Sequence, residues 1–298
     1  MTQTTDVLII GAGPAGVSAA LYARRGGLQV TVLSQGAGTG SLARAELIEN
    51  YYGLEAPVSG AELERRGRAG AERLGVQFVT AEVMGLTLND TMNGFRVEAG
   101  GTVYEAPAVI LAAGAARRTL PIEGLARLEG HGVSYCAICD AFFYRGKNVA
   151  VLGAGEYALH EAQALVPHAA HLTILTNAEA PAAVFPEGMV VNTQPVEAIL
   201  GQTRVEGVRL ADGTTLPVDG VFVALGTAGS TALARKAGAL LDGNNVKVDA
   251  QMSTNVPGLF AAGDNTGGLL QVSKAVYEDA QAGLSAVKYV RQQRAQAQ

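Results

Sequence analysis

The apolar positions of this chain fall into short runs that are separated by longer amphipathic segments. The short runs have the composition of buried strands, and they cover residues 6–10, 30–33, 108–112, 148–152, 172–176 and 221–225. The longer segments have the composition of helices, and they cover residues 17–25, 59–74, 157–165 and 271–290. A smaller meander is predicted from three further runs, at residues 76–79, 95–98 and 102–104. The alternation of strands and helices predicts an α/β protein.

A glycine-rich turn joins the first predicted strand to the first predicted helix. Residues 11–16 read Gly-Ala-Gly-Pro-Ala-Gly. Gly11 would allow the tight turn, Gly13 would let a diphosphate approach the backbone, and Gly16 would let helix and strand pack closely. We therefore expect the phosphates of a dinucleotide at the N-terminus of this helix. The second strand ends at Ser34 without the acid that usually holds the adenosine ribose, so a hydroxyl or backbone group is expected there.

A second unit of the same kind begins at residues 153–155, which read Gly-Ala-Gly between a strand and a helix. Two such turns predict two dinucleotide-binding folds, and the alternative is that the second binds nothing. A 2′-phosphate needs a basic side chain, usually Arg, at the end of the second strand. The residues in that region are Thr176, Asn177, Ala178 and Ala182. Glu156 could also occupy the anion site, and Tyr157 is bulky, so the sequence predicts poor NADPH binding.

Both cysteines of the chain lie in one short motif, Cys136-Ala137-Ile138-Cys139-Asp140. Two residues separate them, so their side chains can close into a disulfide. A dithiol transfers two electrons by thiolate attack on another disulfide, and Asp140 adds a proton donor and acceptor. The alternatives are a structural disulfide, which adds little stability across so short a loop, and half of a zinc site, for which only His131 lies near. The pattern favours a redox-active pair.

Two other features suit a bound cofactor. Residues 36–53 form a long glycine-rich loop with Asn50 near its end, although a turn-forming role is the common alternative for such an Asn. An apolar strand ends in Gly263-Asp264, which could point a carboxylate at ribose or ribityl hydroxyls. The helix that follows could offer its N-terminal amides to a cofactor carbonyl.

Length and charge narrow the possibilities. A chain of 298 residues predicts two domains, and a formal charge of −5 gives no basic footprint for nucleic acid. Two cysteines are too few for a secreted disulfide scaffold, and no signal peptide or membrane span is evident. We therefore expect a cytoplasmic enzyme with no membrane or nucleic-acid partner.

Together these motifs resemble the low-molecular-weight thioredoxin reductase family across the whole chain. The segments that carry the resemblance are residues 11–16, 48–50, 132–140, 143–147 and 258–264. The resemblance implies a homodimer with two Rossmann-like (three-layer ββα) domains, the second inserted into the first. An FAD-binding domain would comprise residues 1–116 and 246–298, and a redox-disulfide domain residues 117–245.

The resemblance also implies roles for single residues. Cys139 would face the flavin and form the charge-transfer thiolate, Cys136 would exchange with the thioredoxin disulfide, and Asp140 would be the acid/base. The residues implied to bind FAD are Gly11, Gly13, Pro14, Ala15, Gly16, Ser34, Gly40, Ser41, Leu42, Asn50, Val83, Ala113, Gly114, Gly263, Asp264, Gln271 and Val272. No metal site is implied.

The electron donor is a separate question. The missing basic residues, together with Tyr135, Ala141 and Lys274-Ala275-Val276, are similar to the ferredoxin-dependent flavin thioredoxin reductases, which lack nicotinamide binding. The leading hypothesis is a thioredoxin reductase that receives electrons from ferredoxin or another non-NADPH donor. The alternatives are the same enzyme with NADPH or NADH, and a non-catalytic FAD-binding redox sensor.

Overall fold

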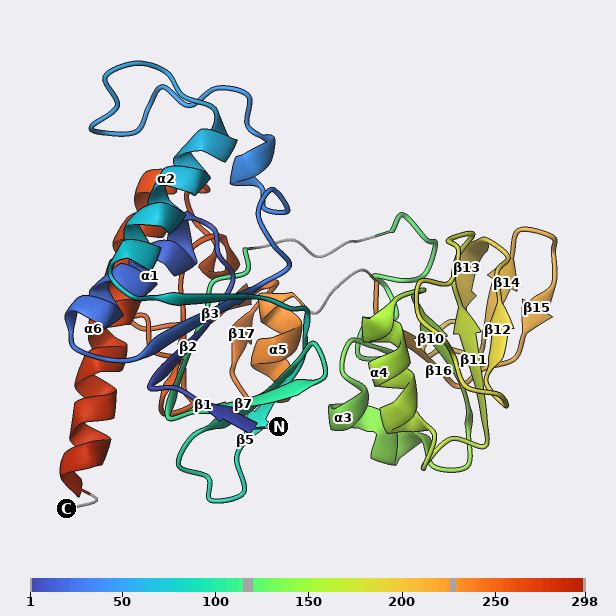
Figure 1. The fold of residues 1–298 in the computed structure, drawn as a ribbon. Coiled ribbons are helices and arrows are strands. Elements are labelled where there is room, and N and C mark those ends of the chain that lie inside the picture. Colours follow the sequence, from blue (N-terminus) through green and yellow to red (C-terminus); the bar gives the residue numbers. More distant parts are fainter. Residues whose placement is uncertain (1, 115–119, 226–228, 297–298) are drawn as a thin grey trace. The chain divides into compact units, whose positions relative to one another are not determined.

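The computed structural model describes residues 2–114, 120–225 and 229–296, with the side chains of Arg44, Ile138 and Cys139 excepted. The chain forms two compact units (Figure 1). The first unit comprises Met1–Ala116 and Gly229–Gln298, and the second comprises Arg117–Ala228. The predicted α/β fold with a second Rossmann-like unit inserted into the first is confirmed.

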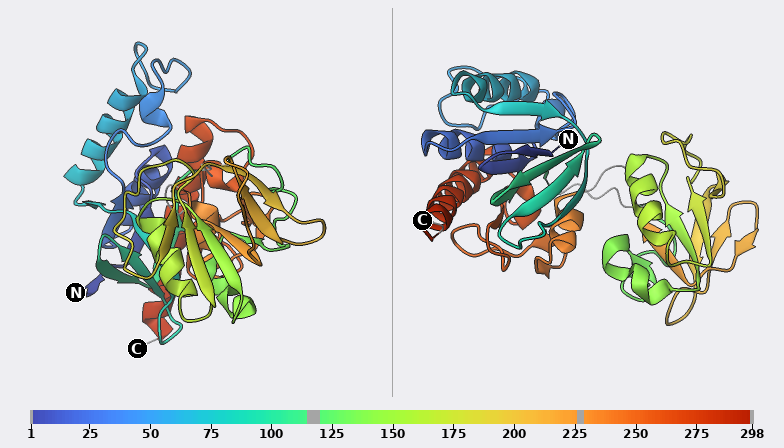
Figure 2. Two further views of the ribbon diagram at one scale, coloured as in Figure 1. Left: turned by 90° about the vertical axis from the view of Figure 1, so that its right-hand side faces the viewer. Right: turned by 60° about the horizontal axis from the view of Figure 1, so that its bottom comes forward.

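The first unit is built on a parallel sheet of order β19-β8-β2-β3-β4. Its strands, in chain order, are β2 (Val7–Ile10), β3 (Val30–Ser34), β4 (Gln77–Thr80), β8 (Ala108–Leu111) and β19 (Leu259–Ala261). Three helices lie on one face of this sheet (Figures 1 and 2), namely α1 (Pro14–Arg25), α2 (Gly60–Arg73) and α6 (Val272–Gln296). A second sheet of order β1-β7-β6-β5 contains β1 (Thr2–Thr4), β5 (Val83–Leu88), β6 (Phe95–Ala99) and β7 (Thr102–Ala106).

The alternation of side chains along β2 explains why both faces of the sheet are covered. Val7 and Ile9 belong to the apolar cluster that includes α1 and α6. Leu8 and Ile10 point to the opposite face, and all four side chains are buried. A strand that is apolar on both faces requires a layer on each side.

The second unit has a parallel sheet of order β12-β11-β10-β16-β9. Its strands are β9 (Val133–Ser134), β10 (Asn148–Leu152), β11 (His171–Leu175), β12 (Val190–Asn192) and β16 (Gly220–Val223). An antiparallel sheet contains β13 (Val196–Leu200), β14 (Gly207–Leu210) and β15 (Thr215–Leu216). The helical segments are α3 (Ala137–Asp140), η2 (Ala141–Tyr144) and α4 (Glu156–Leu165).

Short elements complete the first unit. They are η1 (Leu42–Arg44), α5 (Ser230–Lys236), β17 (Leu241–Asp242), β18 (Asn245–Val246) and η3 (Asp264–Thr266). The compact unit resumes at Gly229, whereas the predicted domain resumed at residue 246. Helix α5 explains the difference, because Lys236 Nζ donates to the Met84 carbonyl at 2.9 Å and Ser230 Oγ accepts from the Ala113 amide at 3.1 Å.

Two predicted elements differ from the structure. Residues 76–79 were assigned to the meander, but β4 pairs in parallel with β3 and forms an edge of the main sheet. The missing strand of the meander is β5, which pairs with β6. Helix α6 continues to Gln296, six residues beyond the predicted end at residue 290. Its last turns are held because Arg291 donates to the Gly26 carbonyl at 2.7 Å and Arg294 pairs with Asp6.

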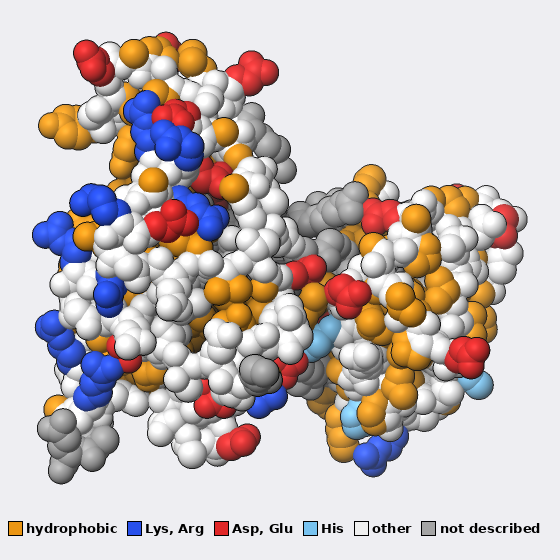
Figure 3. Space-filling model, viewed as in Figure 1, with side chains coloured by type: hydrophobic (Ala, Val, Ile, Leu, Met, Phe, Trp, Pro, Cys, Tyr) orange, Lys and Arg blue, Asp and Glu red, His pale blue; other side chains and the backbone are white. Residues whose placement is uncertain are grey.

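Lys and Arg side chains gather on the helical side of the first unit (Figure 3). Those of α2 are largely paired within the helix, as Arg65 and Arg66 both donate to Glu62 and Arg68 donates to Glu72. The hydrogen bonds from Arg65 and Arg66 lower the pKa of Glu62 to about 2. Separately, no helix in the described ranges is long and apolar enough to cross a membrane.

Candidate active site and flavin-binding residues

The first glycine turn has one open position between two crowded ones. A Cβ on Gly11, which has φ of +114°, would lie 2.3 Å from the Ala112 carbonyl oxygen. A Cβ on Gly16 would lie 1.9 Å from the Gly11 carbonyl oxygen. Gly13 has no atom within 4 Å of its Cβ position. The turn is therefore packed where α1 meets the sheet and open at Gly13, as a diphosphate requires.

The N-terminus of α1 suits an anion. Gly13 is the N-cap residue, no side chain caps the helix, and Pro14 occupies its first position. The first-turn amides of Ala15 and Gly16 have no partner within the helix, because helical hydrogen bonds begin later. These features fit the diphosphate of FAD, and Gly11, Gly13, Pro14, Ala15 and Gly16 form the turn from β2 into α1.

Several other predicted FAD residues lie at the carboxyl edge of the same sheet. Ser34 ends β3 opposite Thr80 of β4, and Val83, which is buried, begins β5 shortly after. Ala113 and Gly114 follow β8, and Gly114 has φ of +73°. Parallel strands bring their carboxyl ends to one edge, which is where ligands bind in open α/β sheets.

The turn after β19 is held by a partly buried polar network. Lys274 Nζ donates to the Gly263 carbonyl at 2.8 Å and pairs with Glu278 Oε2 at 3.0 Å. Glu278 Oε2 also accepts from the Gly263 amide at 3.0 Å. Asp264 follows directly and is partly exposed, as contact with a hydroxyl-bearing ligand would require. Sequence analysis did not anticipate the supporting pair, Lys274 and Glu278.

The long loop reaches the start of α6. Asn50 Nδ2 donates to Gln271 Oε1 at 3.1 Å, which joins two predicted FAD residues 221 positions apart. Val272 begins α6 directly after Gln271. The predicted residues Gly40, Ser41 and Leu42 lie in or beside η1, further back in the loop.

The carboxyl of Asp279 in α6 is fully buried near Gly263. Neither oxygen of Asp279 has a hydrogen-bond partner among the described residues, and its exposure is 0%. Its Oδ2 lies 3.5 Å from the position that a Cβ on Gly263 would take, which is 2.9 Å from the Ala15 Cβ. Burial, and then the charge of Glu278, raise the pKa of Asp279 well above its ordinary value, while Lys274 opposes the shift.

Replacing Asp279 with Asn is expected to stabilise the protein at neutral and alkaline pH. A carboxyl with a raised pKa binds more protons when folded, so the free energy of unfolding falls by up to about 1.4 kcal/mol per pH unit between the unfolded pKa of about 3.9 and the folded pKa. Asn cannot titrate and removes this loss. Thermal unfolding between pH 4 and pH 8 should show that the stability of the variant, relative to that of the parent, increases as pH rises.

Asp242→Asn, at an exposed position of β17, is the control for loss of an acid and should leave the profile unchanged. An Asp279→Asn profile parallel to that of the parent would show that the carboxyl does not titrate as described.

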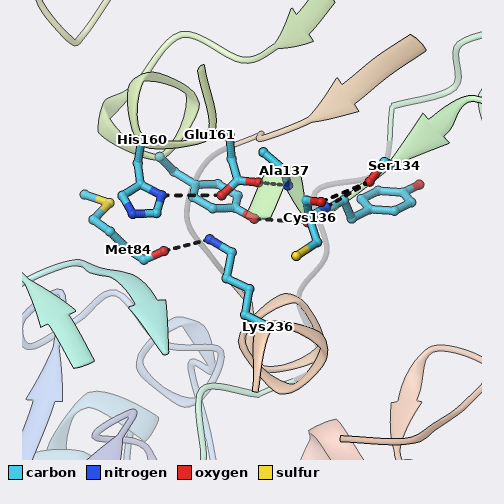
Figure 4. Close-up of polar contacts among 9 residues, drawn as sticks. Met84, Ser134, Cys136, Ala137, His160, Glu161 and Lys236 are labelled. Atoms are coloured by element: carbon cyan, nitrogen blue, oxygen red, sulfur yellow. Dashed lines mark hydrogen bonds and ion pairs between the residues drawn. The ribbon is translucent and has the colours of Figure 1, made fainter. Parts of the chain in front are cut away.

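The cysteine motif lies in the second unit, between β9 and η2 (Figure 4). Cys136 is buried and disulfide-bonded. The Cys139 side chain lies outside the described part of the chain. Ser134 Oγ donates to Asp140 Oδ2 at 2.6 Å and accepts from the Cys136 amide at 3.1 Å. Ser134 therefore holds the predicted acid/base residue beside the first cysteine.

Helix α4 packs against the same motif and binds its backbone. Glu161 Oε2 accepts a 2.6 Å hydrogen bond from the Ala137 amide, and the Tyr157 hydroxyl lies 3.5 Å from the Tyr135 carbonyl. Tyr157 is buried there, so its size gives no separate argument against a nucleotide. Glu161 was not predicted, yet the buried residues of α4 recur at helical spacing and include an acid, which is the signal that could have found it.

In the described ranges, no group of three or more His, Cys, Asp or Glu side chains is placed to hold a metal ion.

At the end of the strand that follows the second glycine turn, residues 176–178 and 182 carry no basic side chain. Thr176 is buried, and its Oγ1 donates to the Glu179 carbonyl at 2.7 Å. Asn177 Oδ1 accepts from the Val196 amide at 2.7 Å. The Ala182 amide donates to the Ala154 carbonyl at 2.8 Å, which brings the following loop back onto the turn itself. The polar groups at this strand end are thus engaged within the protein.

Comparison with known proteins agrees with this geometry. The family model described as pyridine nucleotide-disulphide oxidoreductase matches residues 5–279. The chain belongs to this family. It is 34% identical to the thioredoxin reductase of Listeria monocytogenes serovar 1/2a over 301 residues, which cover 96% of this chain and 93% of that one. It is an oxidoreductase of the thioredoxin reductase-like, disulfide-reducing type.

Two crystal structures of relatives are informative about the subgroup. The atypical thioredoxin reductase TRi from Desulfovibrio vulgaris Hildenborough is 38% identical, with a TM-score of 0.90 over 96% of this chain and 98% of that one. A ferredoxin-flavin thioredoxin reductase from Clostridium acetobutylicum is 31% identical, with a TM-score of 0.73 over 98% of this chain and 100% of that one. Membership in this family of pyridine nucleotide-disulphide oxidoreductases implies FAD as cofactor.

Proposed function

We propose that this oxidoreductase reduces thioredoxin through FAD and the Cys136-Cys139 pair, with electrons from reduced ferredoxin or another donor that is not NADPH. The observation that carries the disulfide chemistry is the hydrogen-bonded arrangement of Ser134, Cys136 and Asp140. The strand end at Thr176 and Asn177 supports a donor without a 2′-phosphate, because both side chains are uncharged and bind backbone groups of the protein. The similarity to a ferredoxin-flavin thioredoxin reductase supports the same donor class.

The proposed chemistry on the protein is a thiol–disulfide exchange. FAD, when bound, supplies the two electrons that reduce the disulfide. The Cys136 thiolate then attacks one sulfur of the thioredoxin disulfide, which forms a mixed disulfide and releases one thioredoxin thiolate. The Cys139 thiolate attacks Cys136, which re-forms the enzyme disulfide and releases the second thiolate. Asp140, held by Ser134, donates and accepts the protons of these steps.

The residues after the motif suit a protein substrate. Phe142 and Phe143 are 65% and 68% exposed, and the Arg145 guanidinium lies 5.3 Å from the Phe142 ring centroid. Exposed aromatic residues next to a reactive centre provide apolar contact area for a partner. This pair is the proposed contact for thioredoxin, and we expect the encounter in the cytoplasm.

We also propose a homodimer. Tyr277 and Leu284 lie seven positions apart on α6 and are 66% and 49% exposed. Tyr22 of α1 is 44% exposed, and its Cβ lies 3.1 Å from the position that a Cβ on Gly283 would take. Burial of this stripe against a second copy would remove apolar surface from water. Light scattering is expected to give about twice the chain mass of 30.6 kDa, and a monomer at micromolar concentration would contradict the proposal.

The thioredoxin reaction can be tested without knowledge of the donor. The FAD-loaded enzyme is photoreduced anaerobically, and oxidised thioredoxin is then added. We expect reoxidation of the flavin together with the appearance of two thiols per thioredoxin. The same protein carrying Cys136→Ser is the control and should show no thioredoxin thiols. A flavin that stays reduced in the parent would favour the redox sensor.

A further inference from the structure

The amide that follows Cys136 is bound by a carboxylate rather than by a neutral group. Ala137 N donates to Glu161 Oε2 at 2.6 Å, and the Glu161 side chain is 1% exposed (Figure 4). Its other oxygen, Oε1, lies 3.4 Å from His160 Nδ1. A charged acceptor makes a stronger hydrogen bond than a neutral one, so this contact holds the start of α3 firmly.

The position of this acid matters because thiol reactivity depends on local charge. Free backbone amides and cations near a cysteine lower its thiol pKa, and a nearby anion acts in the opposite sense. Glu161 both occupies the Ala137 amide and brings negative charge next to the Cys136 backbone. A buried site screens this charge less than water would.

We propose that Glu161 is a positioning residue that makes the Cys136-Cys139 disulfide harder to reduce and holds the motif for exchange. The proposal rests on the proposed disulfide reductase function. Reduction of the disulfide takes up two electrons and two protons and leaves two thiols. Loss of the Cys136 proton leaves a thiolate on the residue that directly precedes the Ala137 amide held by Glu161. The carboxylate therefore disfavours the thiolate form and stabilises the uncharged disulfide relative to the reduced pair.

Glu161→Gln separates charge from hydrogen bonding, since the amide oxygen of Gln can still accept from Ala137. Glu156→Gln is the matched control, because Glu156 lies on the same helix, is exposed and loses the same charge. Glu161→Asp keeps the charge but shortens the side chain. All three are prepared with FAD and equilibrated anaerobically with dithiothreitol of known redox state, and cysteine alkylation is counted by mass.

We expect Glu161→Gln to favour the dithiol by about tenfold, which is about 30 mV in midpoint potential for a two-electron couple. The pH dependence of alkylation should also show a lower thiol pKa in this variant. Glu156→Gln should match the parent, and Glu161→Asp should shift less than Glu161→Gln.

Equal potentials in Glu161→Gln and Glu156→Gln would overturn the proposal, as would equal shifts in Glu161→Gln and Glu161→Asp, which would indicate geometry instead of charge. If Glu161→Gln does not fold, the midpoint potential of Glu161→Asp decides. A potential equal to or below that of the parent agrees with the proposal, and a tenfold shift of the equilibrium toward the dithiol contradicts it. The readout uses neither thioredoxin nor an electron donor. Failure of the proposed function would instead appear as a parent enzyme that equilibrates with dithiothreitol but leaves thioredoxin oxidised.

Discussion

Cys136→Ser is expected to abolish thioredoxin reduction, with a loss on the order of 10³-fold or more, as is usual when an enzyme's nucleophile is removed. A serine hydroxyl stays protonated at neutral pH and cannot replace a thiolate. Because the chain has two cysteines, this variant retains one thiol, at Cys139. It should trap no mixed disulfide with thioredoxin. A long-wavelength thiolate–flavin absorption band should remain, since Cys139 is the predicted flavin-facing residue.

Cys139→Ser is the reciprocal variant and should lose that absorption band. It should also accumulate a covalent complex with thioredoxin, because Cys136 can attack but no second thiol can release the product. Non-reducing electrophoresis and anaerobic spectra distinguish the two variants. The opposite pattern would exchange the roles of the two cysteines, and full activity in either variant would remove the pair from the mechanism.

NADPH is expected to reduce the bound flavin poorly compared with reduced ferredoxin. The 2′-phosphate carries close to two negative charges, and such groups are normally held by bidentate Arg. Charge-assisted hydrogen bonds contribute about 1.5–3 kcal/mol each. The absence of two of them weakens binding by roughly 10²–10⁴-fold. The side chains at this strand end, Thr176 and Asn177, are instead engaged by the Glu179 carbonyl and the Val196 amide.

The measurement is anaerobic mixing of the oxidised enzyme with NADPH, NADH or reduced ferredoxin, followed by flavin absorbance. NADH is the matched control, since it lacks only the 2′-phosphate. Slow bleaching with NADPH and fast bleaching with ferredoxin would agree with the proposal. Faster bleaching with NADH than with NADPH would assign the difference to the 2′-phosphate. Rapid, saturable bleaching by micromolar NADPH would identify an ordinary NADPH-dependent enzyme.

The sequence was most informative in two situations. In one, the backbone conformation of a residue decides its role, and in the other, the lack of a charged side chain does. The spacing of Gly11, Gly13 and Gly16 predicted one open and two crowded positions, and the Cβ contacts at these glycines agree. Likewise the lack of Arg after the second strand could be seen directly, because a missing side chain needs no tertiary information.

Residues whose roles depend on packing could not be predicted in this way. Tyr157 follows the second glycine turn in sequence, but it packs toward Tyr135 because the helix turns that side chain inward. Residues 76–79 have the pattern of any short strand, and only pairing with β3 places them at the edge of the main sheet. Glu161 and Asp279 lie on the buried faces of helices, and they contact residues that are distant in the sequence.

The insertion of the second unit into the first also affects the order in which the chain can fold during synthesis. In the first unit, Asn265 binds the Leu111 carbonyl from 154 residues away, and Ser18 binds the Val276 carbonyl from 258 residues away. At about 5–20 residues per second, the ribosome needs roughly 8–30 s to make the segment that separates β8 from β19. The inserted unit is continuous and can fold in that interval. The apolar faces of α1 and β8 stay exposed until α6 has been synthesised. Nascent chains halted before residue 259 are therefore expected to bind chaperones.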